Sequence, residues 1–220
     1  MKSFKFILML SCALFLNSCA SGYKTIDPKN LNYNSNTTNN LVTLEYKYDL
    51  LQKKYAKKEA KKGVKLVAVK IKNYSGKDLI FGKDVKLTYG SENELYVLEN
   101  EAVYKSLKQS PASYLWYLLL TPIAFNTTST NSNGAQEITS STPVGVVIGP
   151  GLAGGNMIVA SSANKKFKRE LSDYNLNGMT IKNGETAYGL IGIKSDNYDA
   201  IKIKIEQTEP ITPKPDNAGM

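Results

Sequence analysis

The chain has 220 residues, a formal charge of +9, 42% apolar residues and no histidine. The apolar content is sufficient for a folded core and excludes a globally disordered chain. The missing histidine excludes Ser-His-Asp and Cys-His catalytic sites and histidine-ligated zinc or haem. The basic excess favours anionic neighbours, such as lipid headgroups or cell-wall polymers.

The N-terminus has the pattern of an export signal. Lys2 and Lys5 precede an apolar run of eleven residues, 6–16, which is too short to span a bilayer but has the length of a signal-peptide core. Leu16-Asn17-Ser18-Cys19 follows, with an aliphatic residue three positions before the cysteine and a small residue directly before it. This tetrapeptide resembles the lipobox of bacterial lipoproteins. An ordinary secretory signal followed by a coincidental cysteine is the alternative.

The resemblance implies that residues 1–18 are a lipoprotein signal peptide and that Cys19 becomes the lipidated N-terminus. Two or three acyl chains anchor a protein stably, at ~0.8 kcal/mol per buried methylene. Because Ala20 is not the aspartate that resembles an inner-membrane retention signal, we expect an outer-membrane protein that faces the periplasm.

Cleavage of the signal peptide leaves 26 basic and 19 acidic residues, a net charge of +7, and export argues against nucleic acid as a partner. Cys12 is lost, so the mature chain has no disulfide.

Both ends of the mature chain are predicted to lack regular structure. Residues 19–40 begin with the lipidated cysteine and continue as a polar, Asn-rich segment without periodicity, which predicts a flexible tether. Residues 208–220 are rich in proline and are predicted to be a disordered tail.

Between these ends, alternating apolar and polar residues predict short β-strands. A first group precedes residue 100 and a second follows residue 175: 42–50, 64–72, 79–81, 85–89, 95–98, then 179–182, 186–193 and 201–205. Asn183-Gly184 predicts a hairpin turn, and Gly189 and Gly192 predict a bulge or a close backbone approach. The pattern predicts a mainly β fold: an Ig-like antiparallel β-sandwich of about seven strands over 41–207, interrupted by an apolar, partly helical insertion, 105–172.

The Asn73–Gly76 turn and the later Ile181-x-x-Gly184-Glu185-x-x-x-Gly189 pattern resemble those of Ig-like domains in many small bacterial lipoproteins. The resemblance implies a domain that binds or scaffolds rather than catalyses.

The insertion is unusually poor in charge, since Glu137 is the single charged residue between 109 and 164. It contains two apolar segments, 113–125 and 143–160. Trp116 and Tyr117 are of the type that favours a membrane interface. The pairs Gly145/Gly149 and Gly151/Gly155 have the small-xxx-small spacing that allows close helix approach. Three interpretations stay open: segments packed on the sandwich, a hairpin that dips into the lipid leaflet, and a self-association surface.

Two basic clusters lie outside these apolar segments, one before them and one after them in the sequence. Seven lysines lie between 53 and 65 at spacings that stack several on one face of a short helix, and Lys165-Lys166-Phe167-Lys168-Arg169 follows the second apolar segment. Contact with phosphate-bearing lipids or cell-wall material is one interpretation, and solvated faces are the other.

The sequence therefore predicts a lipid-anchored, non-enzymatic envelope protein. It binds or scaffolds at the periplasmic face of a membrane, with a Gly-rich apolar insertion for membrane contact or self-association. We expect no catalytic residue, metal or cofactor apart from the covalent lipid on Cys19; the partners are the membrane and either an envelope protein or further copies of the chain. Two alternatives are a carboxylate-dependent envelope hydrolase and a structural homo-oligomer built through the Gly-rich segment.

Overall fold

The computed structural model describes residues 19–206, so the predicted signal peptide and Pro-rich tail lie outside the described residues. The described chain divides into two compact units. Unit 1 contains residues 19–25, 51–58 and 104–170. Unit 2 contains residues 26–50, 59–103 and 171–206.

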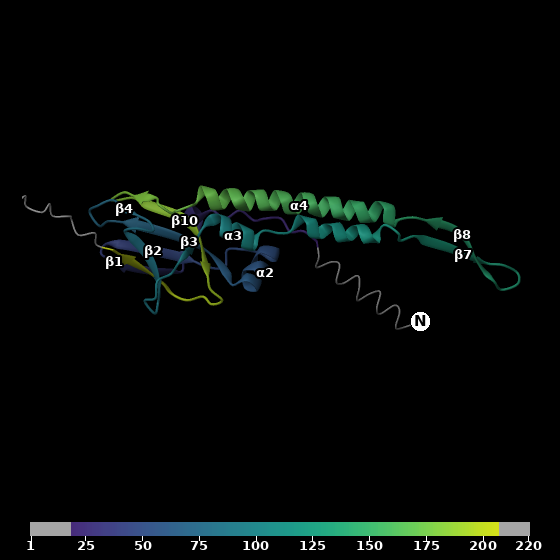
Figure 1. Ribbon diagram of the computed structural model, residues 1–220, viewed down its shortest axis with the longest axis horizontal. Coiled ribbons are helices and arrows are strands. Elements are labelled where there is room, and N and C mark those ends of the chain that lie inside the picture. Colours follow the sequence, from purple (N-terminus) through teal and green to yellow (C-terminus); the bar gives the residue numbers. More distant parts are fainter. Residues whose placement is uncertain (1–18, 207–220) are drawn as a thin grey trace, which may run out of the picture. The chain divides into compact units, whose positions relative to one another are not determined.

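Unit 2 is built around a five-stranded antiparallel sheet (Figure 1). Its strands, in spatial order, are β1 (Ser35–Asn39), β2 (Val42–Lys47), β3 (Val64–Asn73), β10 (Thr186–Lys194) and β6 (Val97–Leu98). The central strands β3 and β10 pair from Thr186↔Lys72 to Lys194↔Val64. Both are rich in β-branched residues, and their near-continuous burial is that of strands in the middle of a sheet.

Two smaller antiparallel ladders complete unit 2: β5 (Val85–Tyr89) with β11 (Ile201–Ile205), and β4 (Leu79–Ile80) with β9 (Thr180–Ile181). One apolar core joins the large sheet to these ladders, because it contains Val69 and Ile191 from the sheet together with Leu87, Ile203 and Ile181 from the ladders. A short 3₁₀ helix, η1 (Pro28–Asn30), precedes β1.

The close backbone approach predicted at Gly189 and Gly192 is present. A Cβ atom on Gly189 would lie 2.2 Å from the side chain of Leu176, and one on Gly192 would lie 2.1 Å from Val103. No larger residue fits against β10 at these two points without moving its neighbours.

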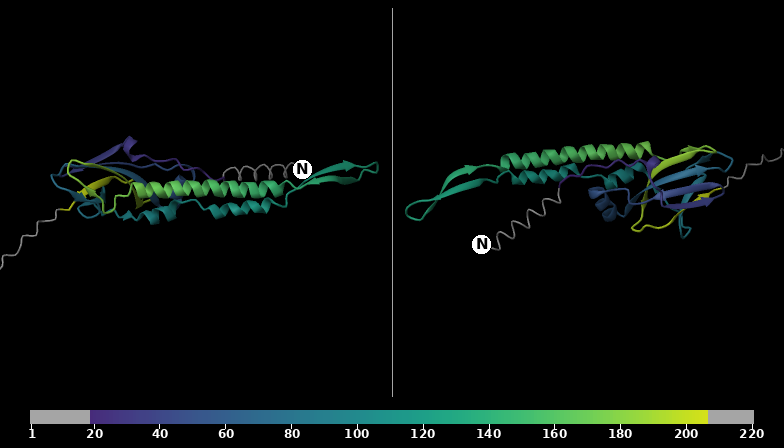
Figure 2. Two further views of the ribbon diagram at one scale, coloured as in Figure 1. Left: turned by 90° about the horizontal axis from the view of Figure 1, so that it is seen from above. Right: turned by 180° about the vertical axis from the view of Figure 1, so that it is seen from behind.

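Unit 1 contains the apolar middle of the chain. The helix α4 (Gly145–Asp173), whose residues 145–170 belong to this unit, lies alongside the 3₁₀ helix η2 (Pro111–Leu120) in both figures of the whole chain (Figures 1 and 2). A hairpin of β7 (Phe125–Thr130) and β8 (Gln136–Thr142) connects the two helices. Parts of α2 (Lys53–Lys62) and α3 (Asn100–Leu107) complete the unit.

The prediction of an antiparallel β protein with helical content is confirmed in its coarser form. The described residues form eleven strands in several small antiparallel sheets, together with three α-helices, and do not clearly form a single Ig-like sandwich. Every segment predicted as a strand contains one. The turn at Asn183-Gly184 is present, with φ of +81° at Gly184, but β9 and β10 pair with different strands and so do not form a hairpin.

The predicted tether over 19–40 is wrong, because this segment contains η1 and β1. β1 pairs with β2 across a two-residue turn in which Asn40 and Leu41 both have positive φ. Backbone hydrogen bonds form this ladder, so a polar, Asn-rich sequence forms a strand at the sheet edge without apolar alternation.

Candidate membrane-contact surface

The inner face of η2 follows the three-residue period of a 3₁₀ helix. Tyr114 and Tyr117 are buried and Leu120 is partly buried, so these three residues line one face. They pack with Ala153 and Ala160 of α4. The contact between the two helices therefore consists of tyrosines on one side and small residues on the other.

Glycines bring α4 close to the backbone of η2 and the residue that follows it. A Cβ atom on Gly145 would lie 2.1 Å from the carbonyl oxygen of Leu120, and one on Gly149 would lie 3.0 Å from that of Tyr117. The Gly145/Gly149 pair thus serves an approach within the chain. By contrast, a Cβ atom on Gly151 or Gly155 would have no neighbouring atom within 4 Å, so their side of α4 is open.

The outer faces carry the large apolar side chains. Trp116 is 74% exposed, Val147 77% and Ile158 72%. Further exposed apolar residues lie on η2, on the hairpin and on the first half of α4: Leu115, Leu118, Leu119, Ile123, Phe125, Ile138, Val146, Ile148, Leu152 and Val159. We call residues 111–160, with these outward side chains, the apolar arm.

The apolar arm is therefore inverted relative to a water-soluble helix pair, with two tyrosines and small residues inside and most of the large aliphatic side chains and Trp116 outside. Helices packed in a lipid bilayer show this arrangement, since small residues allow close backbone contact and lipid covers the remainder. A concentration of exposed apolar side chains of this kind is typical of a surface that contacts a membrane or a protein. By length and composition α4 is also apolar enough to cross a membrane, and 22% of its most apolar stretch is buried.

Neutral amides form a buried hydrogen-bond network in unit 1. The Asn164 side chain accepts from the Gln109 amide nitrogen at 2.8 Å and donates to its carbonyl oxygen at 2.9 Å. It also accepts from the Tyr55 hydroxyl at 3.0 Å. The Gln109 side chain in turn bonds both the amide nitrogen (3.1 Å) and the carbonyl oxygen (2.6 Å) of Ser21. This network fixes the N-terminal segment to the helices.

The candidate lipidation residue stands at the end of this fixed segment. Cys19 is exposed, and the amide nitrogen of the next residue, Ala20, donates to the Asn156 side chain of α4 at 2.5 Å. Tyr23 packs against Tyr55 and Phe167, with ring centroids 5.1 and 5.3 Å apart. Instead of a tether, the structure places Cys19 directly beside the apolar arm.

Charge is divided unequally between the units. Unit 1 has eleven basic residues (Lys24, Lys53, Lys54, Lys57, Lys58, Lys105, Lys108, Lys165, Lys166, Lys168, Arg169) and two acidic ones (Glu137, Glu170), a net charge of +9. The described part of unit 2 has 14 basic and 15 acidic residues, a net charge of −1. The basic excess of the sequence is thus confined to the unit that carries the apolar arm.

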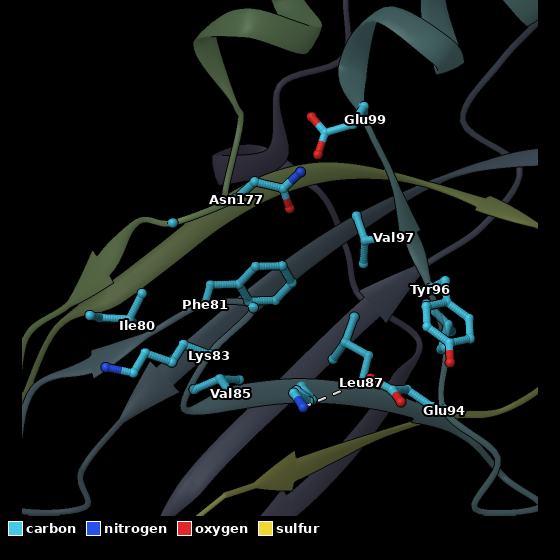
Figure 3. A pocket seen from close by; sticks show the side chains of 14 residues that line it. Ile80, Phe81, Lys83, Val85, Leu87, Glu94, Tyr96, Val97, Glu99 and Asn177 are labelled. Atoms are coloured by element: carbon cyan, nitrogen blue, oxygen red, sulfur yellow. Dashed lines mark ion pairs between the residues drawn. The ribbon is translucent and has the colours of Figure 1, made fainter. Parts of the chain in front are cut away.

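Unit 2 has a hollow of about 410 Å³ with an apolar floor (Figure 3). Phe81, Leu87 and Val97 point into it, and Glu94 and Glu99 lie on opposite sides. Glu94 pairs with Lys86 at 3.9 Å. The hollow has room for an apolar side chain of a partner, and it separates the two carboxylates instead of bringing them together.

Some of these residues are evident from the sequence and others are not. Trp116 points outward and Tyr117 inward; Gly145 and Gly149 face η2, whereas Gly151 and Gly155 face open space. Sequence reasoning missed Gln109 and the role of Asn156, whose signal was a single amide within an apolar segment.

Within residues 19–206 there is no group of three or more Cys, Asp or Glu side chains that could hold a metal ion.

Comparison with known protein families, with characterised proteins and with solved structures gave no match.

Proposed function

We propose that the protein is a lipid-anchored, non-enzymatic component of the bacterial envelope whose apolar arm enters the membrane beside Cys19. In this proposal the lipid and the arm hold the chain at the periplasmic face of the outer membrane, and unit 2 binds or scaffolds a partner. The inverted packing of the arm carries the proposal, because it leaves Trp116, Val147 and Ile158 largely exposed where a lipid leaflet would cover them.

The position of Cys19 supports the same membrane contact. Because the Ala20 amide is bonded to Asn156, acyl chains on Cys19 would begin alongside α4. Eleven residues separate Asn156 from Gly145, or about 17 Å of helix at 1.5 Å per residue. Lying along the leaflet, this stretch of helix would occupy the same leaflet as the acyl chains.

The β7–β8 hairpin limits how the arm lies. The two strands pair only with each other, so both outer edges have free backbone groups, and the side chains of the hairpin are mostly Thr, Ser and Asn. Unpaired backbone groups cost several kcal/mol each in hydrocarbon. The hairpin therefore belongs in the headgroup layer or in water, and the arm lies within the leaflet rather than crossing the bilayer.

For the finer fold, we propose that unit 2 is an Ig-like β-sandwich. The support is the single apolar core that the five-stranded sheet shares with the β5–β11 and β4–β9 ladders.

The proposal is tested with a Cys19→Ala variant that is exported by a cleavable secretory signal. The measurement is how much of this variant stays in the membrane fraction after an alkaline carbonate wash. We expect the variant to remain in the membrane fraction, since the arm is a second anchor. Adding Ile158→Asp to this variant should release it, whereas adding Tyr96→Asp, at an equally exposed position of unit 2, should not. Full release of the Cys19→Ala variant itself would contradict the proposal and would assign the arm to a protein interface.

A second candidate function is a structural homo-oligomer. The open side of α4 at Gly151, Gly154 and Gly155 favours it, because glycines without neighbours allow close approach of another helix. The size of the lipid-free chain in a mild detergent separates the candidates, since a monomer supports the membrane arm and a defined oligomer supports self-association.

A further inference from the structure

We propose that Lys58, Lys108 and Lys168, gathered around Tyr104, form a binding site for the phosphate of an anionic lipid headgroup. We call these four residues the collar. This inference rests on the proposed function, because it assumes that unit 1 meets a membrane.

The collar is defined by its geometry. The ammonium nitrogens of Lys108 and Lys168 lie 5.2 and 5.1 Å from the centroid of the same ring, that of Tyr104. The Lys58 ammonium donates a hydrogen bond to the main-chain carbonyl oxygen of Lys108. The Tyr104 ring packs against the fully buried Phe167, 6.2 Å away. Lysines from α2, from the residue after α3 and from α4 thus converge at one place.

Such a convergence of positive charge favours an anion. Unit 1 has eleven basic residues and two acidic ones, Glu137 and Glu170, so its charge stays strongly positive whatever ion pairs these two carboxylates form. Lys165, Lys166 and Arg169 are exposed on the same part of α4 as Lys168 and add to the field. A cation–π contact stabilises each ammonium while leaving its positive charge in place.

The neighbouring apolar arm indicates which anion the collar meets. Twelve residues, about 18 Å of helix, separate Lys168 from Asn156, where the candidate lipidation site is fixed. If the arm lies in the leaflet, the collar stands at the level of the headgroups. Phosphate oxygens are strong acceptors for lysine ammonium groups, and each basic residue near an anionic surface adds roughly fivefold to binding.

Vesicle binding by the mature, lipid-free Cys19→Ala chain tests the inference. The single tryptophan, Trp116, reports binding by a blue shift of its fluorescence. Vesicles of phosphatidylcholine alone are compared with vesicles that also contain phosphatidylglycerol. We expect a preference for the anionic vesicles that falls roughly 25-fold in Lys108→Gln/Lys168→Gln, at about fivefold per lysine. Binding to phosphatidylcholine alone should not change.

A matched pair of exposed lysines in unit 2 is the control: Lys182→Gln/Lys194→Gln removes the same charge and should leave the preference nearly unchanged. An equal loss in the control would show a general electrostatic effect instead of a site and would overturn the inference. An unchanged preference for anionic vesicles in the collar variant would overturn it too. Saturable binding of inorganic phosphate without vesicles would assign the collar to a soluble anion instead of a headgroup.

The two proposals fail differently. If the apolar arm does not enter membranes, the parent Cys19→Ala chain does not bind phosphatidylcholine vesicles, whatever the collar does. If only the collar inference is wrong, that binding persists and the anionic preference is insensitive to Lys108 and Lys168.

Discussion

The two units of this chain distribute their apolar residues between the interior and the surface in opposite ways. Unit 2 buries Val, Ile and Leu from a sheet and two ladders in a common core and has a net charge near zero. In unit 1 the apolar arm places tyrosines, alanines, glycines and an amide inside and leaves most Val, Ile and Leu and the Trp outside, and the unit has a net charge of +9. Water as the solvent explains the first arrangement, and the proposed contact with a lipid leaflet and its anionic headgroups would explain the second.

The largest expected difference between the units lies in the cost of removing an apolar side chain. Ile71→Ala empties a fully buried position of β3 and should lower the free energy of unfolding in water by about 2–5 kcal/mol. Ile158→Ala, at an exposed position of α4, should change it by less than about 0.5 kcal/mol. Urea unfolding of the lipid-free chain measures both. Equal losses would break the comparison, since they would mean that the arm is covered in solution.

A buried ionisable group gives unit 2 a pH dependence. Glu59 accepts the Leu66 amide hydrogen at 2.7 Å, and burial raises the pKa of its carboxyl from the ordinary 4.5 to about 7. Between these values the folded state binds more protons than the unfolded state. The free energy of unfolding should therefore fall by about 3 kcal/mol as the pH rises from about 4.5 to about 7, and then level off.

Urea unfolding between pH 5 and 8 measures this effect in the lipid-free chain. Glu59→Gln retains an acceptor for Leu66 and should flatten the profile over that range. A profile that keeps its slope in this variant would assign the pH dependence to another group. In unit 1 the Gln109, Asn156 and Asn164 side chains are neutral amides, so their network should contribute no such slope.

Membrane affinity should depend on unit 1 and not on unit 2. Val147→Asp places a charge on the outer face of the arm and should weaken binding of the lipid-free chain to phosphatidylcholine vesicles roughly 100-fold, the equivalent of about 3 kcal/mol. Tyr96→Asp, at a similarly exposed position of unit 2, should leave it unchanged. Trp116 fluorescence measures both; a similar loss in the two variants would contradict a membrane contact confined to the arm.

The smallest expected effect separates the two glycine pairs of α4. Gly145→Ala should destabilise the helix pair by roughly 1–3 kcal/mol, because its methyl group would meet the Leu120 carbonyl oxygen. Gly151→Ala, on the open side, should stabilise α4 by about 0.5–1 kcal/mol through the better helix propensity of alanine. Hydrogen exchange of α4 amides measures both signs. Destabilisation by Gly151→Ala would indicate that a second helix already occupies that side.

Local patterns in the sequence determined the strands and the candidate anchor. The alternation of Val42, Leu44 and Tyr46, and of Ile201, Ile203 and Ile205, predicted β2 and β11, because alternate side chains of a strand face opposite sides. The lysine spacing predicted the short helix that became α2. The lipobox resemblance at Cys19 and the charge-poor stretch from 109 to 164 were also visible without any structure.

Only the tertiary structure decided which strands pair and which way the apolar residues of the insertion face. Asn183-Gly184 specified a turn, yet the partners of β9 and β10 come from segments about a hundred residues away. The hydrogen bond from Ala20 to Asn156 joins residues 136 positions apart and fixes the chain beside the candidate lipidation residue, where the sequence predicted a tether. A sequence shows how many apolar residues a segment has, but inside and outside are defined by contacts between distant segments, and in the first half of α4 those contacts place the small residues within.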